Sequence, residues 1–242
     1  MVVGLTGGIG SGKSTVSRIL QKKGYPLIDL DKISHEVIEY PEVIEKLVKA
    51  FGEDILDENG KISRRKLGAV VFGNKEKLRE INSIMHPVIL DEMRRQVQLL
   101  EKINKIVFVE IQLLFEVKWE KEFDVILLVY ADRETQIKRV MERDGRTFEE
   151  VEKIIDSQIN LEEKKKKSDY VIDNTKKIEE VELEIEKILK DYNYILEDGA
   201  TFSLTLTNEE IKNRYDDLPD FFYKIMSGLA FSSNNYKKTS QN

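Results

Sequence analysis

The feature that most constrains this sequence is a glycine-rich segment at residues 7–14, which follows a short apolar run at the N-terminus. Its spacing is that of the phosphate-binding loop G-x-x-x-x-G-K-[ST], and the fixed positions are Gly7, Gly12, Lys13 and Ser14. Glycines let backbone N–H groups turn toward one anion, and the helix that follows points its positive end at the same place. Lys13 can then reach the β- and γ-phosphates of a nucleotide, and the Ser14 hydroxyl can join a Mg²⁺ shell. The alternative is a chance glycine-rich turn, and the expected strand–loop–helix context speaks against it.

Continuous apolar runs alternate with helical patterns along most of the chain. Continuous apolarity is typical of parallel strands that are covered on both faces, and long crossovers between strands indicate a doubly wound sheet. We therefore expect a three-layer α/β fold around a central parallel five-stranded sheet, with ligands at the carboxyl ends of the strands. The expected strands are Val2–Thr6, Tyr25–Leu30, Ile106–Ile111, Val125–Tyr130 and Tyr170–Asp173.

Apolar residues at helical spacing predict the helices between these strands. Residues 75–100 should form one or two helices broken near His86 and Pro87, because proline interrupts a helix interior. Thr147 and Glu150 match a capping box that opens a helix. The other expected helices are residues 13–23, 43–51, 63–72, 133–144, 148–161 and 178–192.

Composition excludes several classes of protein. The formal net charge of −6 argues against a protein that binds nucleic acid mainly through its phosphates. Cysteine is absent, so disulfides and thiolate metal sites are excluded, and the two histidines, His35 and His86, are too few for a histidine-rich centre. No apolar run approaches the roughly 20 residues that span a bilayer, and no leader pattern precedes the first strand, so we expect a soluble cytoplasmic protein. The lysine run at residues 164–167 is expected to be a solvated helix end.

Acidic residues lie at or just beyond the carboxyl ends of two of the expected strands and are candidates for chemistry. A carboxylate at Asp31 can accept the proton of an attacking hydroxyl or hold a Mg²⁺ water shell, and it can also simply cap a helix. Asp29 is a weaker candidate, because neighbouring strand residues point to opposite faces. Glu110 closes the third strand and is a weaker candidate for a Mg²⁺ ligand. Glu116 lies one or two turns further along the chain. Judged singly, each of these two glutamates is more often structural.

Three arginines, Arg139, Arg143 and Arg146, lie in a segment that resembles a mobile lid. The first two share one face of a helix, from which they could close on the γ-phosphate and stabilise the charge that develops during transfer. The alternative is a ladder of ion pairs with Glu134 and Glu142 on the same helix.

The character of the sequence changes after about residue 196. Residues 201–207 alternate as a strand would, residues 218–231 are apolar and aromatic, and residues 232–242 are polar and expected to be disordered. The extension, residues 197–242, is too short for an independent core. We therefore expect residues 197–231 to dock on the main domain or on another chain, including a second copy.

The motifs, taken in order, resemble the dephospho-coenzyme A kinases over about residues 1–192. The phosphate loop is generic, whereas the His-Pro segment, the Leu-Leu-Phe-Glu segment and the final Asp-Asn are more selective. The segments that carry the resemblance are Gly7–Thr15, Ile28–Asp31, Ser63–Leu67, Met85–Ile89, Leu113–Glu116, Gln136–Arg139, Arg143-Asp144 and Asp169–Asn174.

The resemblance implies a Mg²⁺-dependent kinase that transfers the γ-phosphate of ATP to the ribose 3′-hydroxyl of dephospho-coenzyme A, the last step of coenzyme A synthesis. It implies a P-loop kinase domain over residues 1–196, with a helical acceptor-binding insertion at about 32–100 and a lid at about 139–165. Residues 197–242 have no counterpart in this resemblance, so their role stays unassigned.

The resemblance also implies roles for individual residues. Asp31 would act on the 3′-hydroxyl, Arg139 and Arg143 would face the phosphates, and Asn174 would lie near the adenine. From its apolar neighbours alone, His86 would be assigned to the core. The implied catalytic residues are Lys13, Asp31 and Arg139, and the implied acceptor contacts are Asp31, Arg64, Arg65 and His86. The implied ATP contacts are Gly8, Gly10, Ser11, Gly12, Lys13, Ser14, Thr15, Arg143 and Asn174.

One departure from the family pattern is Gln112, which stands where the family usually has proline before Leu-Leu-Phe-Glu. The change alters how the chain leaves the strand without removing a reacting group. Two other functions stay open, namely another P-loop kinase of nucleosides or nucleotides and a catalytically silent ATP-binding regulator. The intact Lys13, Ser14 and Asp31 speak against the silent regulator, and the segment with Arg64 and His86 is what separates the kinases.

Overall fold

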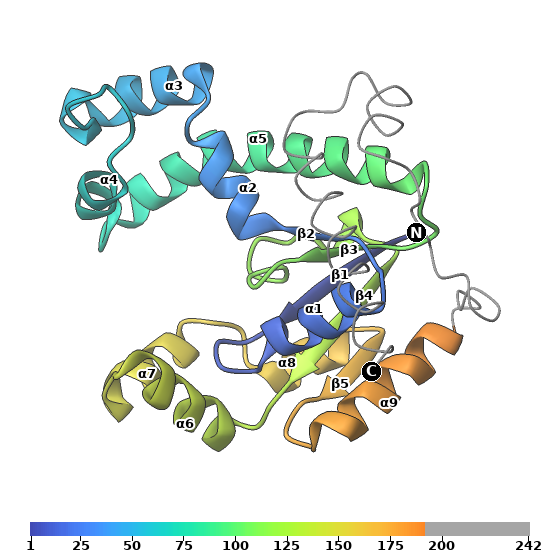
Figure 1. The fold of residues 1–242 in the computed structure, drawn as a ribbon. Coiled ribbons are helices and arrows are strands. Elements are labelled where there is room, and N and C mark those ends of the chain that lie inside the picture. Colours follow the sequence, from blue (N-terminus) through green and yellow to red (C-terminus); the bar gives the residue numbers. More distant parts are fainter. Residues whose placement is uncertain (192–242) are drawn as a thin grey trace, which may run out of the picture. The chain divides into compact units, whose positions relative to one another are not determined.

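The computed structural model describes residues 1–191, so the expectations for residues 197–242 lie outside the described residues. The described chain forms a parallel sheet of five strands in the order β2-β3-β1-β4-β5 (Figure 1). The predicted α/β fold with a central parallel sheet is therefore confirmed. The strands are β1 (Val2–Gly7), β2 (Leu27–Asp29), β3 (Val107–Glu110), β4 (Val125–Tyr130) and β5 (Tyr170–Asp173).

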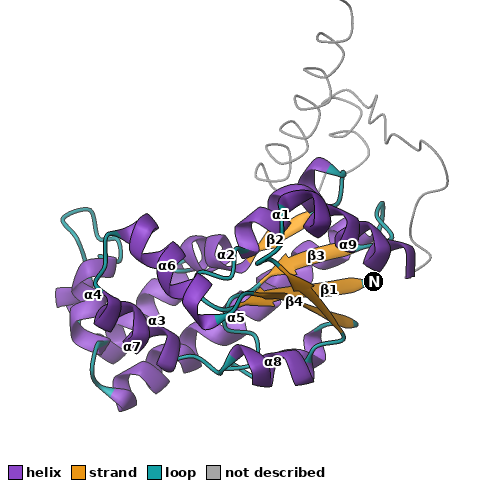
Figure 2. Cartoon of the chain, turned by 90° about the horizontal axis from the view of Figure 1, so that it is seen from below, coloured by secondary structure: helices purple, strands orange, loops and turns teal. Residues whose placement is uncertain are grey.

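Helices cover both faces of the sheet (Figure 2). The helices α1 (Lys13–Lys22) and α9 (Ile178–Asp191) lie on one face, and α5 (Lys75–Glu101) and α8 (Leu161–Lys167) lie on the other. Right-handed crossovers explain this arrangement. The crossover from β1 to β2 runs in one direction across the sheet and the crossover from β2 to β3 runs in the other, so their helices lie on opposite faces. The β1, β3 and β4 side chains between the two helical layers form the core.

One group of helices extends beyond the carboxyl ends of the strands, and we call it the α2–α5 arm (Figure 1). It contains α2 (Leu30–Val37), α3 (Pro41–Phe51), the short turn η1 (Glu53–Ile55), α4 (Arg64–Val71) and the first half of α5. The expected break near His86 and Pro87 is wrong, since α5 continues through Pro87. The buried residues Met85, Ile89 and Met93 lie on both sides of the proline, so packing of one continuous face offsets the lost backbone hydrogen bond.

A second group, the α6–α7 arm, also lies beyond the strand ends and contains α6 (Arg133–Asp144) and α7 (Phe148–Asp156) (Figure 1). Asp132 caps α6 by accepting from the Thr135 backbone N–H, and the capping box of Thr147 and Glu150 is present at the start of α7. The single helix expected over residues 148–161 is wrong. The observed helix α7 ends at Asp156, and a separate helix, α8, begins at Leu161, where the Asn160 side chain caps its first turn.

Between β3 and β4 the chain forms an irregular connection with one short turn, η2 (Glu120–Glu122). Within residues 1–191, no helix has both the length and the apolarity that a membrane crossing requires.

Candidate active site

The phosphate loop joins the carboxyl end of β1 to the first turn of α1 (Figure 1). Gly10 and Gly12 both have positive φ, at 73° and 86°, a backbone conformation that other residues rarely adopt. A Cβ atom on Gly12 would lie 1.9 Å from the amide nitrogen of Asn174. Glycine at position 12 therefore allows both the turn of the loop and the close approach of Asn174.

Two side chains hold the outer side of this loop. The Asn174 amide donates to the carbonyl oxygen of Ser11 at 2.8 Å, and Arg139 donates to the same oxygen at 3.4 Å. Arg139 also donates to the backbone carbonyl of Asn174 at 2.8 Å. The structure thus brings Arg139 and Asn174 to the phosphate loop, where they contact its backbone.

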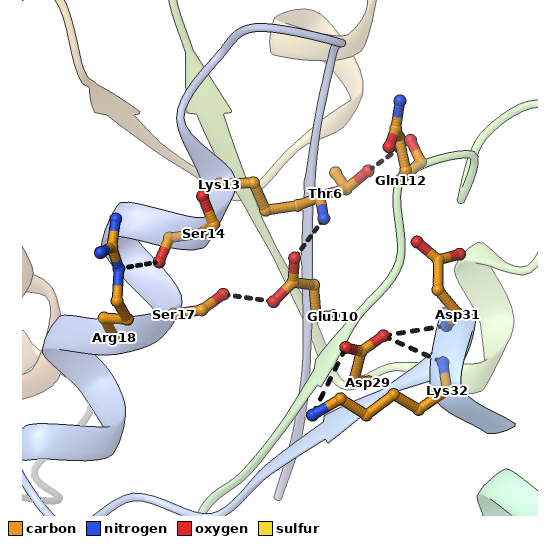
Figure 3. Close-up of polar contacts among 10 residues, drawn as sticks. All are labelled: Thr6, Lys13, Ser14, Ser17, Arg18, Asp29, Asp31, Lys32, Glu110 and Gln112. Carbon is orange, nitrogen blue, oxygen red and sulfur yellow. Dashed lines mark hydrogen bonds and ion pairs between the residues drawn. The ribbon is translucent and has the colours of Figure 1, made fainter. Parts of the chain in front are cut away.

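Lys13 forms an ion pair with Glu110, the last residue of β3 (Figure 3). The other Glu110 oxygen accepts a hydrogen bond from the Ser17 hydroxyl at 2.5 Å. The strand register places Glu110 near Lys13, because Glu110 pairs with Leu5 of β1 and with Asp29 of β2 at the carboxyl edge of the sheet. The cation and the carboxylate lie where bound phosphates and a divalent ion would meet.

Asp29, the last residue of β2, and Asp31, in the first turn of α2, have different roles (Figure 3). Asp29 caps α2, since its carboxylate accepts from the backbone N–H groups of Asp31 and Lys32 at 3.0 and 3.3 Å. The alternative that Asp31 is the cap is therefore wrong. Asp31 is an exposed residue in the first turn of α2, two positions after Asp29, which pairs with Glu110 at the carboxyl edge of the sheet. Its carboxylate is available to a ligand there.

The predicted acceptor residues lie on the α2–α5 arm. Arg64 and Arg65 are exposed at the start of α4, and Arg64 donates to the backbone carbonyl of His35 at 3.4 Å. His86 lies on α5 against the indole ring of Trp119, with ring centroids 5.2 Å apart and nearly perpendicular. Partial burial lowers the pKa of His86 from its ordinary value and so favours the neutral imidazole.

The remaining arginines belong to the α6–α7 arm. Arg143 forms a two-pronged ion pair with Asp144, at 2.7 and 2.8 Å, and Arg146 lies 4.0 Å from the same carboxylate. The ion-pair partner of Arg143 is therefore Asp144, whereas the ladder considered from sequence used Glu134 and Glu142. The Asp144 pair raises the pKa of Arg143, so this side chain stays a cation.

Hard oxygen ligands suited to Mg²⁺ are present at this edge of the sheet. The Ser14 hydroxyl is exposed at the start of α1, and the Glu110 carboxylate lies on the neighbouring strand. Mg²⁺ in kinases commonly takes one or two protein oxygens together with substrate phosphates and water. Within residues 1–191, no cluster of three or more acidic or histidine side chains forms a closed metal cage. The residues present are compatible with an ion that arrives with a nucleotide.

Some residues of the site were missed from sequence. Ser17 reaches Glu110 from one turn beyond Lys13, and its i,i+4 spacing from Lys13 was a usable signal. Gln136 and Gln158 contact the phosphate loop, and they come from elements distant in sequence. Gln136 is polar on the buried face of α6, beside Ile137 and Val140, and a polar residue at such a position could have marked it.

A phosphate loop on a five-stranded parallel sheet, with an exposed carboxylate after the second strand, defines a P-loop kinase, a phosphotransferase. The family model for dephospho-CoA kinase matches residues 1–180, and the chain belongs to the dephospho-CoA kinase family. A dephospho-CoA kinase of Carboxydothermus hydrogenoformans is 45% identical over 197 residues, covering 80% of this chain and 95% of that protein. The Fusobacterium nucleatum dephospho-CoA kinase is 43% identical over 187 residues, covering 77% of this chain and 96% of the relative.

Solved structures agree with this assignment. The dephospho-CoA kinase from Campylobacter jejuni superposes with a TM-score of 0.56 at 34% identity, covering 78% of this chain and 96% of that one. The Thermus thermophilus protein TT1252 superposes with a TM-score of 0.70 at 36% identity, covering 79% of this chain and 97% of the other. The sequence-based identification of the family and of a kinase is confirmed.

Proposed function

We propose that this protein transfers the γ-phosphate of ATP to the ribose 3′-hydroxyl of dephospho-coenzyme A, giving ADP and coenzyme A. The observation that carries the proposal is the placement of Lys13, Glu110 and Asp31 at one edge of the sheet, in a chain of the dephospho-CoA kinase family. A phosphate loop beside an exposed carboxylate is what in-line transfer to an alcohol requires.

In the proposed step, Asp31 accepts the proton of the 3′-hydroxyl as its oxygen bonds to the γ-phosphorus. The bond between the γ-phosphorus and the β–γ bridging oxygen breaks, and its electron pair leaves with ADP. Phosphoryl transfer needs positioning and charge neutralisation more than covalent catalysis, so we expect no phosphoenzyme. General base assistance of this kind commonly contributes a factor of about 10²–10⁴ in rate.

The phosphate loop and its neighbours are proposed to hold ATP. Lys13 would exchange part of its contact with Glu110 for the β- and γ-phosphates, and the loop N–H groups would contact the same anion. Asn174 and Arg139 already contact the loop backbone, which supports their assignment to this site. The proposed ATP-binding set is Gly8, Gly10, Ser11, Gly12, Lys13, Ser14, Thr15, Arg143 and Asn174.

Mg²⁺ is proposed to be held by the Ser14 hydroxyl and the nucleotide, with Glu110 as the weaker candidate. Mg²⁺ held there would supply positive charge that offsets the negative charge developing during transfer. Glu110 contributes from this chain by orienting Lys13 and by accepting from Ser17.

The acceptor is proposed to lie along the α2–α5 arm, with Arg64 and Arg65 near its phosphates and His86 beside it. The lid is proposed at about residues 139–165, which includes most of the α6–α7 arm, with Arg139 as the residue that stabilises the transferred charge. Arg139 donates to the backbone carbonyls of Ser11 and Asn174, which holds its guanidinium beside the phosphate loop and supports this assignment. A cytoplasmic location and contacts of residues 197–231 with another chain stay predictions from sequence.

The proposal is tested by measuring ADP formation with a panel of acceptors, namely dephospho-coenzyme A, nucleosides and nucleoside monophosphates. We expect turnover with dephospho-coenzyme A and at least tenfold lower kcat/KM with the others. Lys13→Ala should remove activity, and Asp31→Asn should lower kcat by about 10²–10⁴. Asp29→Asn is the matched control, because asparagine caps a helix as well as aspartate.

Each result that would contradict the proposal bears on one part of it. Equal turnover with nucleosides would contradict the assigned substrate and favour the rival kinase class. Wild-type activity in Asp31→Asn would contradict the assigned base. Binding of ATP without turnover of any acceptor would favour the silent regulator.

A further inference from the structure

Ile9 is a variable position of the phosphate-loop pattern, yet three contacts hold it in place. Its backbone N–H donates to the side-chain oxygen of Gln158 at 3.0 Å. Its backbone carbonyl accepts from the side-chain nitrogen of Gln136 at 2.6 Å. The Ile9 side chain packs against the apolar cluster between the two helices of the α6–α7 arm, formed by Ile137, Val140 and Val151.

The two glutamines come from opposite ends of the α6–α7 arm. Gln136 lies in the first turns of α6 and is 4% exposed, and Gln158 follows the end of α7 on the way to α8. A Cβ atom on Gly8 would lie 2.6 Å from the side-chain nitrogen of Gln136, so glycine at position 8 leaves room for this contact. The start of α6 and the end of α7 lie side by side, since Arg133 pairs with Asp156 at 2.8 Å, so both glutamines contact the loop from the base of the arm.

Peptide geometry links these contacts to anion binding. In a trans peptide the carbonyl and the following N–H point in opposite directions. Because Gln136 holds the Ile9 carbonyl, it also sets the direction of the Gly10 N–H on the other side of that peptide plane. Gly10 has φ 73°, and N–H groups of successive residues in such a turn form the concave anion site of a phosphate loop.

We infer that Gln136 and Gln158 are positioning residues that couple the α6–α7 arm to the phosphate loop through Ile9. Movement of the arm must carry Ile9 with it or break the three contacts, so arm position changes the direction of the Gly10 N–H. The inference rests on the proposed function only in taking ATP as the anion. It assigns to two side chains a role in nucleotide affinity without placing either against the nucleotide.

The opposite polarity of the two hydrogen bonds provides the test. Gln136 donates and Gln158 accepts, and an ionised glutamate can only accept. Gln158→Glu therefore keeps its bond to the Ile9 N–H, whereas Gln136→Glu sets a carboxylate against the Ile9 carbonyl. Both variants add one negative charge near the loop, so their difference reports hydrogen bonding.

The experiment measures the Kd of the full-length protein for ATP with Mg²⁺ by calorimetry, and the KM values for ATP and for dephospho-coenzyme A. We expect Gln136→Met and Gln158→Met each to raise the Kd for ATP about five- to tenfold. Gln136→Glu should raise it at least tenfold more than Gln158→Glu does. The KM for dephospho-coenzyme A should change less than twofold in the Gln158 variants, which a general loss of structure would not allow.

Glu152→Gln is the control within the arm, because Glu152 forms an ion pair with Arg133, whereas the side chains that bond the Ile9 backbone are Gln136 and Gln158. Its Kd for ATP should equal that of the wild type. The half-exposed Gln158 carries the test if a substitution at the buried Gln136 prevents folding. A wild-type Kd for ATP in Gln158→Met would overturn the inference. So would an equal rise of the Kd for ATP in Gln136→Glu and Gln158→Glu.

Failure of the proposed function gives a different result. A wild-type protein that turns over dephospho-coenzyme A while the glutamine variants bind ATP normally would refute the coupling alone. A wild-type protein inactive on dephospho-coenzyme A, with ATP affinity shifted as described in the variants, would refute the substrate and support the coupling.

Discussion

The ammonium of Lys164 on α8 lies 2.7 Å from the carboxylate of Glu116, in the connection that follows β3, and the Lys164 side chain is fully buried. The same Glu116 carboxylate accepts from the backbone N–H of Ile159, and Lys164 also reaches the carbonyl of Gln112 at 3.5 Å. The ion pair therefore links α8, which follows the α6–α7 arm, to the connection between β3 and β4. Lys164 is not part of a solvated helix end, as the lysine run had suggested.

Loss of Lys164 should destabilise the fold strongly. In Lys164→Met the Glu116 carboxylate is left partly buried without its cation, and breaking a buried pair from one side commonly costs about 3–5 kcal/mol. Lys166→Met is the matched control, since Lys166 is exposed on the same helix and should change stability by less than about 0.5 kcal/mol. Urea unfolding of both variants measures the difference. Equal midpoints would contradict a structural role for the pair.

Gly12 and Gly24 allow the backbone strain of a positive φ to be separated from the steric effect of an added Cβ atom. Both have φ near 86°, but a Cβ on Gly12 would strike Asn174 whereas a Cβ on Gly24 meets nothing within 4 Å. Gly24→Ala should cost about 1–2 kcal/mol of stability and leave the KM for ATP unchanged. Gly12→Ala should suffer the same strain and also displace Asn174, raising the KM for ATP at least tenfold. Steady-state kinetics beside thermal unfolding separates the two effects, and similar kinetics in both variants would contradict the role of Asn174.

The stability of the fold should depend on the protonation of His86. Partial burial lowers its folded-state pKa, while in the unfolded chain it titrates near 6.5. The unfolded state therefore binds more protons below that pH, so stability is complete above about pH 6.5 and declines as pH falls toward the folded-state pKa. Below the folded-state pKa this contribution is fully lost.

Urea midpoints measured between pH 8 and pH 5 test this dependence. His86→Gln should flatten the profile over that range, whereas His35→Gln, at the exposed histidine of α2, should keep the wild-type profile. A wild-type slope in His86→Gln would show that other groups cause the decline.

Local chemistry explains which features were predictable from sequence. The phosphate loop depends on glycines at fixed spacing, and the caps at Asp132 and Thr147 depend on side chains one turn from the N–H groups that they accept from. The strands were predictable because each contains a continuous apolar run, as a sheet covered on both faces requires, although β2, β3 and β5 end in an acidic residue.

The features that were missed depend on contacts between distant segments. The continuity of α5 through Pro87 is set by the elements that its buried face packs against. Burial of Lys164 needs Glu116, which lies 48 positions earlier in the sequence, and the tie between Gln158 and Ile9 spans 149 positions. A pattern along one segment carries no information on such partners. Arg139 was a candidate for phosphate contact from its helix face, whereas Asn174 was singled out only by the family resemblance, which implied a place near the adenine.

Removal of residues 197–242 should leave catalysis intact. The family model ends at residue 180, and the Fusobacterium nucleatum relative is covered over 96% of its length by 77% of this chain. The last described helix, α9, ends at Asp191, and every residue assigned to the site precedes it. A protein ending at Leu196 should therefore keep kcat and both KM values within about twofold of the full chain. Steady-state kinetics tests this, and light scattering of both proteins compares their oligomeric states. A change in oligomeric state with unchanged kinetics would identify the extension as an assembly element, whereas loss of turnover in a folded truncated protein would show that catalysis depends on it.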